Sequence, residues 1–205
     1  MAIADDNELM VEGISAVLRR QKGLSVCGFA VDKKSTFALL EEKKPDVLLL
    51  SLFVKGDGID LVKHVTARFP ETRVIVTAAG SQELYTERLL RAGASACLSP
   101  ERTNAHDLVD AIRKAVAPMR LERRPMQRTT RRSAPGLASL SKLTDRELHV
   151  FRLIGRGGGT GDIARELGLS SRTIEYYREQ IKRKLGYRDK PSLHKGAFEW
   201  AQRAL

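Results

Sequence analysis

The sequence contains few cysteines and no metal-binding spacing. Cys27 and Cys97 are the only two in 205 residues, and neither belongs to a Cys-X-X-Cys pair. The four histidines are scattered along the chain, so no zinc site is expected. Two distant cysteines of this kind are typical of reduced, buried thiols in a cytoplasmic protein.

Long hydrophobic runs are also missing. The longest, residues 47–54, is too short to cross a bilayer and contains Ser51. The N-terminus does not combine a basic start with an apolar segment, so no signal peptide is expected. These absences predict a soluble protein without a membrane partner.

The motifs of several common enzyme classes are absent. The glycine-rich residues 155–160 match neither GxxxxGK[ST] nor GxGxxG, and they lie between two expected helices. Residues 93–97 miss the nucleophile-elbow pattern at their last position. We therefore expect neither an enzyme nor a bound cofactor.

Acidic residues are scarce in the second half of the chain. Residues 1–117 hold 16 basic and 16 acidic side chains, whereas residues 118–205 hold 20 basic and 9 acidic ones. The formal net charge of +11 therefore lies entirely in the second half. This asymmetry favours a polyanionic partner for that half, although a merely solvated basic surface would have the same composition.

Short β-like runs alternate with helical patterns up to residue 117. Strands are expected at residues 2–4, 24–30, 46–52, 73–77 and 94–98. Between them, apolar residues recur at helical spacing, as Met10, Ile14 and Val17 do. Five alternations predict an α/β domain with a five-stranded parallel sheet and helices on both faces.

Four polar residues stand at the ends of these strands. Asp5 and Asp6 follow the first expected strand, while Ser51 and Thr77 lie near the ends of the third and fourth. In parallel sheets of this class, the site lies at the carboxyl ends of the strands. We therefore expect these four side chains around one crevice.

The composition changes between residues 118 and 140. Arginines are interleaved there with proline, serine and threonine, with little apolar periodicity, which predicts a flexible basic linker. The linker divides the chain into domains at residues 1–117 and 141–205. In the second domain, Thr144 and Glu147 form a capping-box pattern that predicts the start of a helix. Three more helices are expected at residues 160–167, from Ser170 or Ser171 to 185, and at 191–203.

A short helix, a tight turn and a longer basic helix are typical of a helix-turn-helix domain. In the longer helix, Ile174, Ile181 and Leu185 recur on one face and are expected in the core. The remaining surface would meet double-stranded DNA, with basic groups on phosphates and residues near the helix start on base edges. The candidate DNA-binding residues are Arg172, Thr173, Glu175, Tyr176, Arg178, Glu179, Lys182 and Arg183.

Residues 143–200 closely resemble the LuxR/FixJ-type DNA-binding domain. The resemblance is carried by the stretches LTDRE at 143–147, IARELGLS at 163–170, TIE at 173–175 and KLG at 184–186. It implies that the third helix enters the major groove, with Glu175, Tyr176 and Glu179 facing the bases. It also implies a homodimer through the fourth helix, with candidate contacts at Leu193, Phe198 and Trp200. Gly161 stands where many members have lysine, so one phosphate contact is expected to be missing.

The first 117 residues resemble the flavodoxin-like receiver domain of two-component response regulators. The stretches IADD at 3–6, PDVLLL at 45–50, GDG at 56–58, VIVTA at 74–78 and RAGAS at 91–95 carry this resemblance in the right order. A receiver uses two acidic residues after the first strand and an aspartate after the third to bind Mg²⁺, and that aspartate accepts the phosphoryl group. A threonine or serine and a lysine bind the phosphoryl oxygens.

Asp5, Asp6 and Thr77 match this pattern, but the acceptor position holds Ser51. The lysine position falls at Ser99 or Pro100, and Lys55 would replace that lysine only in part. A neutral hydroxyl is a poorer nucleophile and a weaker metal ligand than a carboxylate. The sequence therefore predicts a degenerate phosphorylation pocket of Asp5, Asp6, Ser51, Thr77 and Ser99, with at most weak Mg²⁺ binding by the two aspartates.

Together these features predict a sequence-specific DNA-binding transcription regulator that works without aspartyl phosphorylation. The receiver-like domain would then serve as a dimerisation or partner surface, or as a pocket for a small-molecule signal. The alternative is a protein-interaction module that modulates another regulator without binding DNA.

Overall fold

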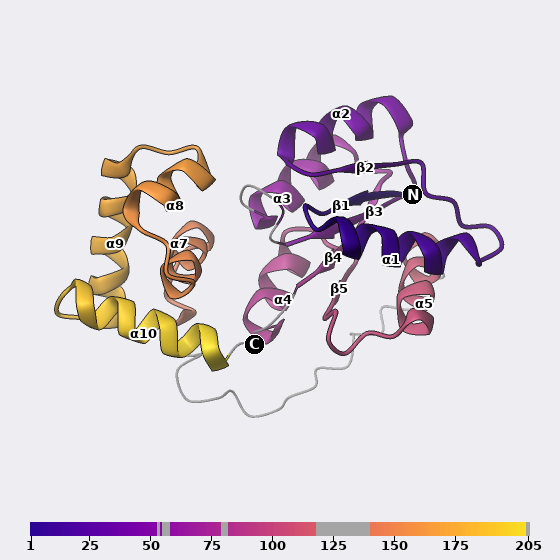
Figure 1. The fold of residues 1–205 in the computed structure, drawn as a ribbon. Helices are drawn as coiled ribbons and strands as arrows, with labels where there is room; N and C mark the ends of the chain where they lie inside the picture. Colours follow the sequence, from indigo (N-terminus) through magenta and orange to yellow (C-terminus); the bar gives the residue numbers. More distant parts are fainter. Residues whose placement is uncertain (53, 55–57, 79–81, 118–139, 204–205) are drawn as a thin grey trace.

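The computed structural model describes residues 1–52, 54, 58–78, 82–117 and 140–203, which form two domains (Figure 1). The linker expected at 118–140 falls outside the described residues except for Leu140, and so does Lys55. Leu140 is buried, so the second domain includes the residue expected to end the linker.

The first domain is the expected α/β fold with a five-stranded parallel sheet of order β2-β1-β3-β4-β5. Its elements are β1 (Ala2–Ala4), α1 (Glu8–Arg19), β2 (Gly28–Ala30), α2 (Lys33–Lys43), β3 (Val47–Ser51), α3 (Gly58–Arg68), β4 (Arg73–Thr77), α4 (Gln82–Arg91), β5 (Ala96–Leu98) and α5 (Ala105–Val116).

Helices cover both faces of this sheet, which confirms the expected arrangement. On one face, Ile3, Leu49 and Ile75 of the central strands pack against α1 and α5. On the other face, Leu48 and Leu50 belong to the core cluster of α2, α3 and α4. The run at residues 47–50 is thus buried from both sides, as its uniform apolar composition predicts.

Three strands are shorter than the sequence predicts, and β3 loses only one residue at each end of the expected range 46–52. The expected strand at 24–30 shrinks to Gly28–Ala30, because it pairs only with β1, which has three residues. The expected strand at 94–98 begins only at Ala96. Burial of both thiols was also a wrong expectation: Cys27 is exposed and Cys97 is half-buried, although both are free.

The second domain consists of the four expected helices, α7 (Asp145–Gly155), α8 (Thr160–Leu167), α9 (Ser171–Leu185) and α10 (Lys190–Arg203). The capping box forms as predicted, because the Thr144 hydroxyl accepts from the Glu147 N–H while the Glu147 carboxylate accepts from the Thr144 N–H. Ser170, rather than Ser171, caps α9. No helix in the part of the chain that the structure describes is long and apolar enough to cross a membrane.

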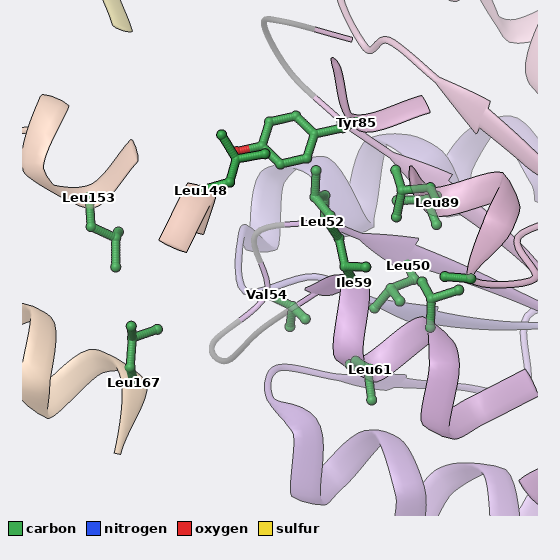
Figure 2. Packing of buried hydrophobic residues seen from close by; sticks show 14 of the residues in the cluster. Leu50, Leu52, Val54, Ile59, Leu61, Tyr85, Leu89, Leu148, Leu153 and Leu167 are labelled. Atoms are coloured by element: carbon green, nitrogen blue, oxygen red, sulfur yellow. The ribbon is translucent and has the colours of Figure 1, made fainter. Parts of the chain in front are cut away.

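The two domains meet through α4 and α7. Tyr85 of α4 lies against Leu148 of α7, and both side chains are buried in one continuous apolar cluster (Figure 2). Asp145, the first residue of α7, pairs with Lys63 of α3 at 2.7 Å and with Arg88 of α4 at 2.8 Å. Helix α9 lies on the far side of α7 from the sheet (Figure 1).

Candidate nucleic-acid interface and receiver pocket

Helix α9 is anchored by its apolar face and leaves its other face in solvent. Ile174 and Ile181 are fully buried, as the helical spacing predicts. The turn before the helix depends on Gly168, whose positive φ of 62° allows the chain to reverse, and on Ser170, which accepts the Thr173 N–H at 3.1 Å. The structure therefore fixes the orientation of α9 before any partner binds.

The exposed face of α9 contains most of the predicted DNA-binding residues. Arg172, Glu179 and Arg183 are exposed, and Tyr176 retains 59% of its surface. Thr173 and Lys182 are half-buried at the edge of this face. Two arginines and one aromatic ring thus share one accessible strip, which suits contacts to phosphates and base edges.

The two glutamates of α9 are neutralised within the domain. Glu175 accepts from the Thr160 hydroxyl at 2.6 Å and pairs with Lys190 at 3.1 Å, and these contacts lower its pKa. Glu179 pairs with Lys182 at 2.7 Å. Glu175 therefore links α9 to α8 and α10, and neither carboxylate presents an uncompensated negative charge to a phosphate backbone.

The expectation that Arg178 contacts DNA is wrong. Its side chain is only 2% exposed, and its guanidinium bonds to His194 Nε2 at 2.7 Å and donates to the Gly158 carbonyl at 3.2 Å. Arg178 follows Ile174 by four residues, so helix geometry places it on the core face. Burial lowers the pKa of His194, with the charges of Arg178 and Lys190 adding to the effect, so this imidazole accepts the bond as a neutral group.

The predicted dimer residues of α10 also divide into core and surface. Leu193 is fully buried in its own domain, so its assignment as a dimer contact is wrong. Trp200 is half-buried against Phe151, with ring centroids 5.6 Å apart. Phe198, which is 54% exposed, is the most accessible of the three for a contact with a second chain.

A part-buried ion pair that no sequence pattern predicted joins α7 to α9. Lys184 donates to both carboxylate oxygens of Glu147, at 2.8 and 2.5 Å, while Thr144 donates its N–H to the same group. Burial raises the pKa of Glu147, but the bonds from Lys184 and Thr144 outweigh it, so the pKa lies below its usual value. The capping-box pattern identified Glu147, but nothing local pointed to Lys184.

The four predicted pocket residues of the first domain do share one cavity. Asp5, Asp6, Ser51 and Thr77 line a chamber of about 800 Å³ at the carboxyl ends of the strands. The wall opposite them belongs to the second domain. It is formed by Arg156, Asp162, Arg165 and Glu166, which the sequence did not connect with this pocket.

Ser51 changes the electrostatics of this chamber. Burial raises the pKa of Asp5, and the charge of Asp6 raises it further, whereas bonds from the Asn7 N–H and the Ser51 hydroxyl lower it. The net effect is a pKa of Asp5 above its usual value. The Ser51 hydroxyl thus donates a hydrogen bond to the Asp5 carboxylate, at the position where a receiver would place a third negative charge.

The donor set does not fit a tightly held Mg²⁺. The acceptor-position hydroxyl is directed to Asp5, which leaves the two aspartates as the only anionic ligands that the receiver pattern supplies. In the described part of the chain, no group of three or more His, Cys, Asp or Glu side chains could hold a metal ion.

Contrary to the prediction, Ser99 does not line the chamber. It is 5% exposed, and its hydroxyl donates to Glu101 at 2.5 Å. Pro100, the other alignment of the lysine position, lines the chamber instead. A proline ring has no group that could pair with a phosphoryl oxygen.

Comparisons with known proteins agree with this two-domain architecture. Residues 1–113 match the response regulator receiver domain, and residues 141–195 match the LuxR family of bacterial regulatory proteins. The oxygen regulatory protein NreC of Staphylococcus aureus strain RF122 is 31% identical over 206 residues, with 94% of each chain covered. NreC of Staphylococcus epidermidis is 28% identical with the same coverage.

The fold also resembles solved structures of the response regulator RcsB. A structure from Salmonella typhimurium superposes with a TM-score of 0.74 at 22% identity, covering 100% of this chain and 97% of that one. RcsB of Salmonella enterica bound to the promoter rprA gives 0.67 at 23% identity, with 95% of each chain covered. The chain therefore belongs to the NarL/FixJ family of response regulators, which join a receiver domain to a LuxR-type DNA-binding domain.

Proposed function

We propose that this protein is a sequence-specific transcription regulator that binds DNA as a homodimer and does not depend on aspartyl phosphorylation. The observation that carries the proposal is the exposure of α9 in the docked two-domain structure. Arg172, Tyr176 and Arg183 are accessible while Tyr85 and Arg88 hold the second domain against the first. DNA binding would then require no signal-driven separation of the domains.

The pocket supports independence from phosphoryl transfer. Ser51 occupies the acceptor position, where its neutral hydroxyl is a poorer nucleophile than the carboxylate of an aspartate and is bonded to Asp5. The position that would bind the phosphoryl oxygens aligns with Ser99 or Pro100, and neither residue is basic. The Ser99 hydroxyl donates to Glu101, and Pro100 lines the chamber. The domain would act as a docking platform rather than a phosphorylation switch.

The surface of the second domain supports a DNA partner. Pairing of Glu175 with Lys190 and of Glu179 with Lys182 removes the repulsion that two bare carboxylates would exert on phosphates. The solved RcsB structures include one described as two dimers bound to DNA. By analogy, the exposed Phe198 of α10 is our candidate for the dimer contact. A chromosomal target would place the protein in the cytoplasm.

The direct test is selection of binding sites from random duplex DNA with the untreated full-length protein, followed by a salt titration. We expect a roughly two-fold symmetric motif and an affinity that falls steeply with salt. Replacing Arg183 by alanine should weaken binding and reduce the salt slope by about one unit, as loss of one phosphate contact does. Arg113→Ala, an exposed change on α5 of the first domain, is the matched control.

Independence from phosphorylation is tested by Ser51→Ala and by acetyl phosphate. Neither the substitution nor the phosphoryl donor should change the affinity for the selected motif. A clear change with either one would overturn this part of the proposal. Absence of any selected motif, both in the full chain and after separation of the domains, would favour the alternative of a protein-interaction module.

A further inference from the structure

A second cavity of the first domain adjoins the chamber that contains Ser51. It has a volume of about 370 Å³ and lies between α1 and α5, lined mainly by apolar side chains. Met10, Ile14 and Val17 of α1 form one wall, and Leu98 and Leu108 contribute to the other. This volume is within the range of pockets that hold small molecules.

The apolar cavity and the polar chamber are continuous at their lining. Asn7, Met10, Thr77 and Pro100 border both of them. A molecule that fills the apolar cavity can therefore present a polar end to the chamber beside Asp5 and Asp6. The composite site lies at the carboxyl edge of the sheet, close to the reversal of strand order between β1 and β3.

Gly13 keeps the apolar cavity open. It lies in the middle of α1, lines the cavity, and a Cβ atom added there would meet no atom within 4 Å. Glycine inside a helix is unfavourable relative to alanine, and no close packing requires it at this position. The helix thus retains a destabilising residue where a side chain would narrow the cavity.

The net charge of the polar chamber determines which polar group of a bound molecule it would favour. Four carboxylates line it against two arginines, and one of those arginines, Arg165, pairs with Asp162 at 3.3 Å. Asp5 and Asp6 are the acidic residues on the side next to the apolar cavity. An excess of negative charge favours a cationic group over an anionic one.

We propose that the two cavities form one site for a small amphipathic amine, with its apolar body between α1 and α5 and its ammonium group beside Asp5 and Asp6. The proposal goes beyond DNA binding and does not rest on it.

The test uses 4-phenylbutylamine as the probe, with 4-phenylbutan-1-ol and 4-phenylbutyrate as matched neutral and anionic compounds. Each is titrated into the full-length protein without DNA, and binding is followed by amide chemical shifts. We expect shifts concentrated in α1 and at the start of α5. The amine should bind about fivefold more tightly than the alcohol, as a partly exposed ion pair allows, and the carboxylate most weakly.

Three variants separate the parts of the site. Gly13→Leu should fill the cavity and weaken amine binding by about tenfold or more. Asp6→Asn should reduce the preference for the amine over the alcohol, because only Asp5 then remains beside the ammonium group, while leaving the affinity for the alcohol unchanged. Ala67→Leu adds the same side chain at an exposed position of α3, on the other face of the sheet, and should bind like the wild type.

The proposal is overturned if the three compounds bind equally, or if Gly13→Leu binds the amine as the wild type does. It is also overturned if the chain self-associates through this face, so that Leu9→Glu lowers the molecular mass measured by sedimentation. Leu9 is 84% exposed at the rim of the apolar cavity. A lower mass for Leu9→Glu would mean that a second copy of the chain, and not a small molecule, covers this cavity.

Discussion

The guanidinium of Arg88 and the carboxylate of Asp145 form a 2.8 Å ion pair between α4 of the first domain and α7 of the second. The same guanidinium donates to the carbonyl oxygens of Leu140, Ser141 and Leu143 at 3.4, 3.3 and 2.7 Å. One side chain thus fixes the first turn of α7 and the segment before it. Because these contacts lie on the side of the second domain away from α9, docking leaves the exposed face of α9 accessible.

Replacing Arg88 by alanine should loosen the two domains. We expect domain association to weaken by about 2 kcal/mol, because an ion pair and several charge-assisted bonds are lost together. Small-angle scattering should report a larger radius of gyration, while the affinity for the selected DNA motif stays within about twofold. Arg91→Ala is the control, since the Arg91–Glu87 pair is exposed and contributes little. A large gain in DNA affinity would mean instead that docking inhibits binding.

Changes at Tyr176 and Glu175 should have different consequences although the two residues are neighbours. Tyr176→Ala should alter the base preference of the selected motif with little effect on melting temperature, because its ring is exposed. Glu175→Gln should lower stability by about 1 kcal/mol and leave the base preference unchanged, because its carboxylate holds Thr160 and Lys190.

Site selection and thermal melting of both variants check this pair of predictions. Tyr176→Phe, which keeps the ring and removes only the hydroxyl, serves as the conservative control. If Glu175→Gln changed the selected bases and Tyr176→Ala did not, Glu175 and not Tyr176 would be the residue that contacts the bases.

The pair of Glu147 and Lys184 predicts an acid sensitivity. The folded pKa of Glu147 lies below 4.5, the usual value of a free glutamate, so its ionised form is more stable in the folded protein than in the unfolded chain. Its contribution is therefore complete above pH 4.5 and is lost as the pH falls through the lower folded value. Thermal melting between pH 7 and pH 3 should show this loss, and Glu147→Gln should remove that part of the pH dependence.

At neutral pH, Lys184→Met should cost about 1–3 kcal/mol, because it leaves the Glu147 carboxylate buried without its cation. Lys195→Met, at an exposed position of α10, provides a comparison in which the same charge is lost from the surface. Equal melting temperatures for the two variants would contradict the proposed contribution of the part-buried pair.

Two glycines inside helices should respond oppositely to alanine. A Cβ atom at Gly155 would lie 2.4 Å from the Ala197 carbonyl oxygen, so Gly155→Ala should force α7 and α10 apart at a cost of about 1–3 kcal/mol. Gly13 has open space around it, so Gly13→Ala should stabilise the protein by about 0.5–1 kcal/mol. Denaturant unfolding of both variants measures the difference, and stabilisation by Gly155→Ala would refute the close packing of α7 on α10.

Much of the architecture could be predicted because it depends on local patterns. The capping box at Thr144 and Glu147 identified the start of α7, and alternation of apolar runs identified the order of strands and helices. The gathering of Asp5, Ser51 and Thr77 also followed from the chain, because the carboxyl ends of parallel strands meet at one edge. These predictions needed only spacing and the geometry of a parallel sheet.

The errors came from side chains whose environment is set by distant residues. The positive charge of Arg178 favoured a prediction of DNA contact, but its position on α9 directs its side chain to Gly158 and His194. Leu193 was correctly placed on an apolar stripe, but a stripe does not tell whether its own domain or a second chain covers it. Ser99 was separated from the pocket by its bond to Glu101, which an alignment of motifs does not show.

The sequence by itself determined the two domains, the positions of their helices, the basic charge of the second half and the serine at position 51, near the end of the third strand. These properties depend on residue identity and on neighbours within a few positions. Only the tertiary structure decided that Arg88 joins the domains, that α9 stays exposed beside them, and that α1 and α5 enclose a cavity continuous with the pocket. Such contacts join residues far apart in the chain, so their energies depend on packing that no local pattern records.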